Sequence, residues 1–470
     1  RSMTPSRPAV AELRRLAALA GPILVVQMSY TGMSATNVII AGQLSATDLA
    51  GVAVRAGVWI PIYLTLCGLL YALAPLVAYR QGSGATAQIR PLLQVGLCCG
   101  LALAALGMLL LWNIEPLLRW MGSPEPVRRV AVDYLRALCA GIPAMMLFQL
   151  LRNLNEGLGL PRLAMRVGTV AFALNIPLAW CLVKGGAGLP ALGGAGCGIA
   201  TALLFWVMFA LLWLLSRRDA RIAPHLRGTV RLDGALLREF LQLGLPIGVG
   251  LFLESGLFAL VALLLAPLGA VAVAAHQVAL NIAATLFMLP LSLALALTVR
   301  LGHHLGASAH PAAHRTLRVA LAMAAVIATG NTLLILLLGE PLVALHSGDA
   351  AVRALALRLL CYAALFQLSD CMQMTLLGAL RALGQTRATM WIAFFVYWGV
   401  TLPLGYSLGI ADWLGPPRGA EGLWIGLTLG ITLAAVLLGW RLRQSSLFDN
   451  TRAQTWKGPP RTLSDPSGSS

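Results

Sequence analysis

Charged residues are scarce in this sequence, and acidic residues are the scarcest. Only 11% of the 470 residues are charged, whereas water-soluble domains carry about 25%. Acidic residues number 17 against 34 basic ones, and 59% of the chain is hydrophobic. The chain therefore has too few polar side chains to cover a surface in water, which excludes an ordinary soluble domain.

Patterns that carry enzyme chemistry are also missing. The sequence has no P-loop, GxSxG, HExxH or dinucleotide-binding glycine pattern. The eight cysteines fall in apolar stretches and form no CxxC or Cys/His metal pattern, which indicates a packing role. We therefore expect neither an enzyme nor a resident cofactor.

Long hydrophobic runs are abundant. A run of about 20 apolar residues can cross a hydrocarbon core of about 30 Å. Lipid-exposed backbone must satisfy its own hydrogen bonds, so these runs are predicted to be helices. The predicted fold is all-α and polytopic, with twelve transmembrane helices. The runs cover residues 14–39, 50–78, 92–113, 130–151, 162–184, 194–216, 241–266, 272–299, 315–338, 352–379, 388–410 and 420–440.

The net charge of +17 follows membrane topology rather than a nucleic-acid surface. With both termini in the cytoplasm, most basic residues fall on the cytoplasmic side, above all in the cluster Arg217–Arg238. This is the positive-inside bias that sets the orientation of a membrane protein. We expect the lipid bilayer as a partner and no nucleic acid.

A weak internal repeat divides the chain into two halves. At an offset of about 224–226 residues, Gly21-Pro22-Ile23 corresponds to Leu245-Pro246-Ile247, and Leu158–Arg162 corresponds to Leu383–Arg387. Six helices per half is an even number, so both halves enter the membrane from the same side. The sequence predicts two six-helix lobes related by a pseudo-twofold axis along the membrane normal. Duplication with a site between the halves is typical of secondary transporters.

The predicted boundaries follow from the runs and the repeat. Residues 1–13 form an N-terminal cytoplasmic segment, in which Arg1 and Ser2 before Met3 are interpreted as remnants of cloning. Residues 14–216 form the N-lobe, 217–240 a basic cytoplasmic loop, 241–440 the C-lobe and 441–470 a disordered cytoplasmic tail.

Glu254 and Asp370 lie in the middle of apolar runs. A charge near mid-bilayer costs several kcal/mol, and such residues usually mark an ion or proton pathway. A low dielectric favours the protonated acid, and a bound cation favours the carboxylate, so such a pair can exchange H⁺ or Na⁺ for a cationic ligand. The alternative is that each is a protonated acid that only holds a helix contact. We predict that Glu254 and Asp370 bind the coupling cation, and that they would be the ligands if the ion is Na⁺.

Other polar and aromatic side chains in the runs are candidates for lining a cavity. Gln367, Asp370 and Gln373 share one helix face, and Gln277 and Asn281 form an i, i+4 pair. Individually, such residues more often form contacts between helices. The cavity or substrate candidates are Asn37, Asn175, Gln277, Asn281, Phe366, Gln367 and Tyr30.

Several motifs resemble the multidrug and toxin extrusion (MATE) transporters, with the NorM-like branch the most similar. The motifs are AAHQVALN at 274–281, FMLPLS at 287–292, VRLGH at 299–303, AG at 41–42 with SATDLA at 45–50, and LGQTR at 383–387. The resemblance covers about residues 10–445. It implies a cation-coupled antiporter of the bacterial inner membrane, which expels lipophilic, often cationic, drugs through a cavity between two lobes. No obligatory protein partner is expected.

The resemblance also assigns roles to single residues. It implies cation coupling and drug competition for Glu254 and Asp370, and a place in the first-lobe cavity for Asn175. The family's first helix usually carries an aspartate where this chain has Asn37, and Ala179 replaces a second asparagine. Asparagine cannot release a proton. Either the first lobe has no coupling site, or this chain is a substituted variant, and both alternatives shift the coupling to Glu254 and Asp370.

Two other classes of function are weighed against antiport. A flippase for lipid-linked precursors would need a large cationic cavity. No arginine or lysine lies deep in the twelve runs, so the interface between the halves is expected to be acidic or neutral. A channel would show no coupling and no dependence on the two carboxylates. Both H⁺ and Na⁺ fit a site of buried carboxylates.

Overall fold

The computed structural model describes residues 8–122, 124–185, 191–227, 233–413, 415–445 and 447. Within these ranges every regular element is helical, as predicted. The first half holds α1 (Pro8–Gly42), α2 (Ala46–Leu70), α3 (Leu73–Gly82), η1 (Thr86–Gln88), α4 (Ile89–Trp112), α5 (Glu115–Trp120), α6 (Glu125–Cys139), α7 (Ile142–Gly157), α8 (Pro161–Lys184), α9 (Gly193–Arg218) and α10 (Ala223–Leu226). The second half holds α11 (Gly234–Leu265), η2 (Ala266–Leu268), α12 (Ala270–Gly306), α13 (His310–His346), α14 (Ala350–Ala382), α15 (Thr386–Phe394), the π-helix η3 (Phe395–Thr401), α16 (Leu402–Gly409) and α17 (Ala420–Arg443).

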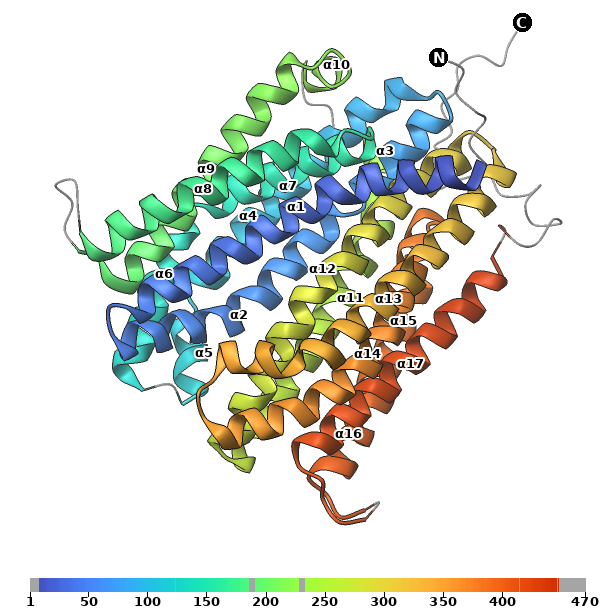
Figure 1. Ribbon diagram of the computed structural model, residues 1–470. Coiled ribbons are helices and arrows are strands. Elements are labelled where there is room, and N and C mark those ends of the chain that lie inside the picture. The colour runs from blue at the N-terminus through green and yellow to red at the C-terminus, as the bar shows by residue number, and fades with distance from the viewer. Residues whose placement is uncertain are drawn as a thin grey trace, which may run out of the picture.

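Most of the predicted membrane spans are present in the described part of the chain. Ten helical stretches there are long and apolar enough to cross a membrane, or eleven if the bent pair α6 and α7 forms one span. The remaining predicted span lies on α1, which is 35 residues long but carries polar residues such as Gln27 and Ser34. α1 packs along α8 and α12, within the same bundle (Figure 1).

Several boundaries differ from the predicted ones, because helices continue past the apolar runs. α11 begins at Gly234 rather than 241, and α13 extends over His310–His346 rather than 315–338. The predicted loop 217–240 thus contains the end of α9, α10 and the beginning of α11. Arg1, Ser2 and most of the predicted tail 441–470 lie outside the described residues.

The helices form two lobes, α1–α9 and α11–α17 (Figure 1). One apolar core lies in the first lobe, around residues such as Leu70 and Phe148, and another lies in the second, around Leu257 and Trp424. The first turns of α11, including Phe240, pack into the core of the first lobe.

In the same way, the beginning of α1, a helix of the first lobe, packs against the second lobe. Leu16, near its beginning, packs with Leu297 and Leu301 of α12, whereas Met33 and Ile40 return to the core of the first lobe. The lobes therefore share core residues at the end of the bundle where α1 and α11 begin. We call this the N-terminal end.

α3 and α12 cross at the N-terminal end with two glycines in the contact. A Cβ atom on Gly82 would collide with the carbonyl oxygen of His303, and one on Gly306 would collide with that of Tyr79. The sequence repeat pairs Gly82 with Gly306 and Tyr79 with His303, so the contact is symmetric. α1 on α12 and α2 on α11 are likewise equivalent helix pairs. The arrangement agrees with the predicted pseudo-twofold relation of the lobes.

Two ion pairs join the lobes at the same end. An Arg80 Nη2–H donates to Glu239 Oε2 at 2.6 Å, and both side chains are buried. Glu12 on α1 accepts hydrogen bonds from Arg300 at 2.8 and 3.0 Å and from the Thr316 hydroxyl at 2.7 Å. Burial raises the pKa of Glu12, but these hydrogen bonds and the positive charge of Arg300 outweigh burial and bring the pKa to about 2.

We predict that Gly82→Ala lowers the thermal unfolding midpoint of the purified protein. The added methyl group has no space against the His303 carbonyl, and overpacking of this kind costs about 1–3 kcal/mol. Gly21→Ala on α1 is the matched control, because nothing lies within 4 Å of a Cβ there. Equal midpoints for both variants would contradict the close crossing.

The contribution of Glu12 to stability should disappear in acid. A carboxylate whose pKa is lowered in the folded protein stabilises it above the ordinary value of 4.5, and this stabilisation is lost as the pH falls toward 2. The difference in unfolding midpoint between wild type and Glu12→Gln should be constant above about pH 5 and shrink below it. A difference that stays constant down to pH 3 would refute the ion pair.

Candidate functional site

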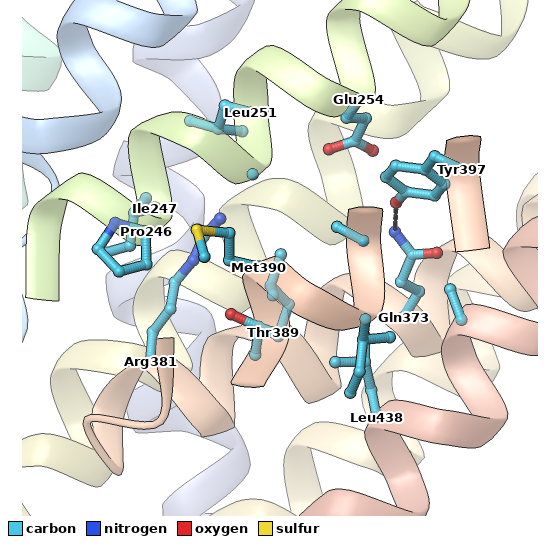
Figure 2. Close-up of a pocket in the computed structure, with 15 residues that line it drawn as sticks. Pro246, Ile247, Leu251, Glu254, Gln373, Arg381, Thr389, Met390, Tyr397 and Leu438 are labelled. Atoms are coloured by element: carbon cyan, nitrogen blue, oxygen red, sulfur yellow. Dashed lines mark hydrogen bonds between the residues drawn. The ribbon is translucent and has the colours of Figure 1, made fainter. Parts of the chain in front are cut away.

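A small cavity surrounds Glu254 in the second lobe. It is lined by residues of α11, α14, α15, η3 and α17, and its polar side chains include Glu254, Gln373, Arg381 and Tyr397 (Figure 2). The space open to the centres of water molecules is about 30 Å³, which is room for one or two waters. The cavity is therefore large enough for a water molecule, a proton or a bare ion.

Local sequence explains why a cavity forms here. Pro246 and Gly250 both line it from α11. Proline removes a backbone hydrogen bond from the helix, and glycine contributes no side chain, so the wall has open space ahead of Glu254. On the opposite side the chain passes through the π-helix Phe395–Thr401, which places Tyr397 over the cavity (Figure 2).

A hydrogen bond joins Tyr397 and Gln373, two of the residues that line this cavity. The Gln373 amide donates to the Tyr397 hydroxyl at 2.6 Å, and both side chains are buried. The carbonyl oxygen Oε1 of Gln373 has no hydrogen-bond partner among the described residues. An acceptor is therefore available beside the Glu254 carboxylate.

Asp370 lies one helical turn before Gln373 on α14, as the predicted polar stripe requires. It is 2% exposed, and its Oδ2 atom has no hydrogen-bond partner in the described part of the chain. It does not line the Glu254 cavity, but the two carboxylates are close enough to interact electrostatically. The structure thus places the two predicted acids near each other without putting both in one cavity.

Arg381 is a buried basic residue within the second lobe, beside Glu254. It is 7% exposed and lines the same cavity as Glu254, within electrostatic range of that carboxylate. Arg55 and Arg152 are also buried, at 5% and 1% exposure. Sequence position suggested basic residues near the membrane surfaces, whereas packing between helices encloses these three.

Gln367 and Phe366 belong to contacts within the second lobe and do not line the Glu254 cavity. The Gln367 amide donates to the Ala283 carbonyl at 3.1 Å, and its oxygen accepts from Asn331 at 3.2 Å. The Phe366 ring meets Phe258 and Trp424 edge-on. Both side chains therefore make contacts between helices of the second lobe.

Gln277 and Asn281 lie apart from the two acids. Both are exposed on α12, and neither lines the Glu254 cavity. The i, i+4 pairing places them on one exposed side of the helix.

In the first lobe, Asn37 and Asn175 come together. Asn175 donates to Asn37 Oδ1 at 3.4 Å and to the Met33 carbonyl at 3.3 Å, and Asn37 donates to Thr201 at 3.2 Å. Tyr30 is separate: it is half-buried and meets the Phe148 ring edge-on. The first lobe thus has a neutral polar cluster, whereas the second lobe has two acids.

Sequence reasoning missed three residues of these clusters, Tyr397, Arg381 and Thr201. Tyr397 and Thr201 stand alone in apolar runs, so nothing in the local sequence separates them from packing residues. Arg381 falls just after the predicted run 352–379, where a basic residue is typical of the membrane surface. The described residues contain no group of three or more His, Cys, Asp or Glu side chains that could hold a metal ion.

The sequence profile of the MatE family matches residues 22–181 and again 246–407, one match in each lobe. This chain belongs to the MATE family. The multidrug resistance protein MdtK of Yersinia pestis (strain Pestoides F) is 40% identical over 437 residues, which cover 92% of this chain and 96% of MdtK. The multidrug resistance protein PmpM of Pseudomonas aeruginosa is 40% identical over 439 residues, which cover 93% and 92% of the two chains.

Solved MATE structures share the fold. The eukaryotic MATE transporter AtDTX14 superposes with a TM-score of 0.87 at 21% identity, over 95% of this chain and 98% of that chain. The Vibrio cholerae MATE transporter VcmN in the bent form gives a TM-score of 0.80 at 20% identity, over 94% and 99%. This MATE protein is a multi-pass membrane protein and not an enzyme.

We expect Gln367→Leu to destabilise this MATE protein, because the Asn331 amide and the Ala283 carbonyl would lose their partner inside the lobe. The cost should be about 1 kcal/mol, seen as a fall of a few degrees in the unfolding midpoint. Gln277→Leu, at an exposed glutamine, is the control and should leave the midpoint unchanged. A fall in the control alone would overturn this assignment.

Proposed function

We propose that this protein is a multidrug antiporter of the bacterial inner membrane, with both termini in the cytoplasm. It exports lipophilic, often cationic, organic compounds in exchange for inward H⁺ or Na⁺. The observation that carries the proposal is the carboxylate of Glu254 in a small cavity with Gln373 and Tyr397, within electrostatic range of Asp370. Family membership and the two relatives named for multidrug resistance support the export of drugs.

The size of the cavity supports an ion site rather than a drug site. Sites for drug-sized ligands measure about 300–1,000 Å³, an order of magnitude more than the 30 Å³ around Glu254. In this proposal the drug binds between the lobes, and the coupling ion binds inside the second lobe. The two ligands then affect each other through charge and helix position rather than through a shared contact surface.

Two buried acceptors support a role for a positively charged ligand. Asp370 Oδ2 and Gln373 Oε1 have no donor among the described residues, and an unsatisfied buried polar atom is costly. A proton on Asp370 would supply one donor. Alternatively, Na⁺ would use the oxygens of Glu254, Gln373 and Tyr397 as ligands, because hard cations prefer oxygen.

Arg381 explains how such an ion would leave again. Its positive charge lies in the same cavity and weakens the attraction between the Glu254 carboxylate and the coupling ion. Binding of the ion lowers the negative charge of the lobe and weakens the attraction for a cationic drug. Coupling requires only that ion and drug bind with different affinity to the two states of the transporter.

The contact between the lobes defines the state described here. Core residues, the α3–α12 crossing and two ion pairs join the lobes at the N-terminal end. In the proposed orientation that end is cytoplasmic, so this state is closed toward the cytoplasm. Alternating access then requires the ion pairs Arg80–Glu239 and Glu12–Arg300 to separate.

The decisive experiment is efflux of a fluorescent organic cation from proteoliposomes, driven separately by a pH gradient and a Na⁺ gradient. We expect transport under one of the gradients. Glu254→Gln and Asp370→Asn should each reduce gradient-driven transport at least tenfold, because neither variant can exchange a charge with the ion. The gradient that drives wild-type transport identifies the coupling ion.

Glu421→Gln is the matched control, because it also removes one carboxylate but lies at the beginning of α17 beside Arg358. It should transport like the wild type. Movement of the dye without a gradient, or gradient-driven efflux that survives both Glu254→Gln and Asp370→Asn, would contradict coupled antiport and favour a channel or flippase.

A further inference from the structure

Arg55 is a buried charge that the proposed transport cycle does not use. It lies on α2 inside the first lobe and is 5% exposed. Its Cζ atom lies 4.3 Å from the centre of the Tyr134 ring on α6. Arginine remains charged inside proteins, so the first lobe carries a permanent positive charge at this place.

Two nitrogen donors of Arg55 lack a partner in the part of the chain that the structure describes. Nε and Nη2 are buried and find no acceptor among the described residues. Arg55 is also in none of the ion pairs formed by those residues. The acid on the same helix, Asp48, accepts from the Ser45 hydroxyl at 2.6 Å and from the Gly194 backbone N–H at 2.8 Å, so its oxygens are already engaged.

Stacking on Tyr134 does not offset the cost of this charge. A cation–π contact is worth less than the penalty for enclosing an ion in a low dielectric without a counter-charge. Water could satisfy the N–H groups, but it would leave the charge uncompensated. An anion would satisfy the donors and the charge together.

The polar side chains linked to Tyr134 through hydrogen bonds are neutral. The Tyr134 hydroxyl contacts Thr201 Oγ1 at 3.2 Å, and Asn37 donates to the same oxygen at 3.2 Å. Asn37 stands where the resemblance to MATE transporters predicts an aspartate. The cluster therefore combines a fixed positive charge with amide and hydroxyl groups, a combination opposite to that of a cation site.

We propose that Arg55 binds a small inorganic anion, with chloride as the abundant example, beside Tyr134 in the first lobe. The anion is held by the guanidinium charge and by the free Nε–H and Nη2–H donors. The same charge repels cations from the Asn37–Asn175 cluster. Cation coupling is thereby confined to the second lobe, whichever ion drives it.

The test is thermal unfolding of the purified full-length protein in sodium chloride, sodium bromide or sodium gluconate at equal ionic strength. A ligand that binds only the folded state raises the unfolding midpoint in a saturable way. We expect chloride and bromide to raise the wild-type midpoint by a few degrees over gluconate. Arg55→Met removes the charge and should abolish this difference.

Arg129→Met is the control, since it removes an arginine of α6 whose side chain is 75% exposed. It should keep the full halide effect. No halide effect in the wild type, or an equal effect in Arg55→Met, would overturn the anion site. If Arg55→Met does not fold, the site is tested instead by anomalous diffraction from crystals of the wild type soaked in bromide. An anomalous peak within hydrogen-bond reach of Arg55 supports the site, and no peak there refutes it.

Discussion

The crossing of α3 and α12 is the contact on which the arrangement of the two lobes depends. Gly82 and Gly306 let the two backbones approach to a distance that no side chain would permit. This approach brings the ends of α3 and α12 next to the beginnings of α11 and α1, where Arg80 meets Glu239 and Arg300 meets Glu12. Charges that would be costly in an apolar bundle are thus neutralised across the boundary between the lobes.

The two halves share a backbone plan but differ in chemistry. The repeat pairs Glu254 with Tyr30, so the acid of one lobe corresponds to a neutral phenol in the other. The first lobe holds the neutral Asn37–Asn175 cluster and the unpaired charge of Arg55, whereas the second holds two acids and Arg381. The frame is symmetric, and the side chains inside it are not, so buried acids gather in one lobe only among the described residues.

Sequence reasoning succeeds here where the signal is local and fails where it depends on packing. Apolar length and the repeated motifs predict an all-helical, duplicated chain, and carboxylates stand out in apolar runs. The partners of a buried polar residue are harder to predict: Gln367 accepts a hydrogen bond from Asn331, which lies on another helix. The partners of Glu254 come from α14 and the π-helix, and nothing in the local sequence shows that these segments meet.

The π-helix Phe395–Thr401 has a consequence for the winding of the second lobe. A π-turn holds one residue more than an α-turn, and each residue turns a helix by about 100°. If this segment rewound to α geometry, the side chains on one side of it would rotate relative to those on the other. Tyr397 would then leave Gln373, and the Glu254 cavity would lose one wall. A change of helical register within one segment would therefore open the Glu254 cavity without any tilt of the lobes.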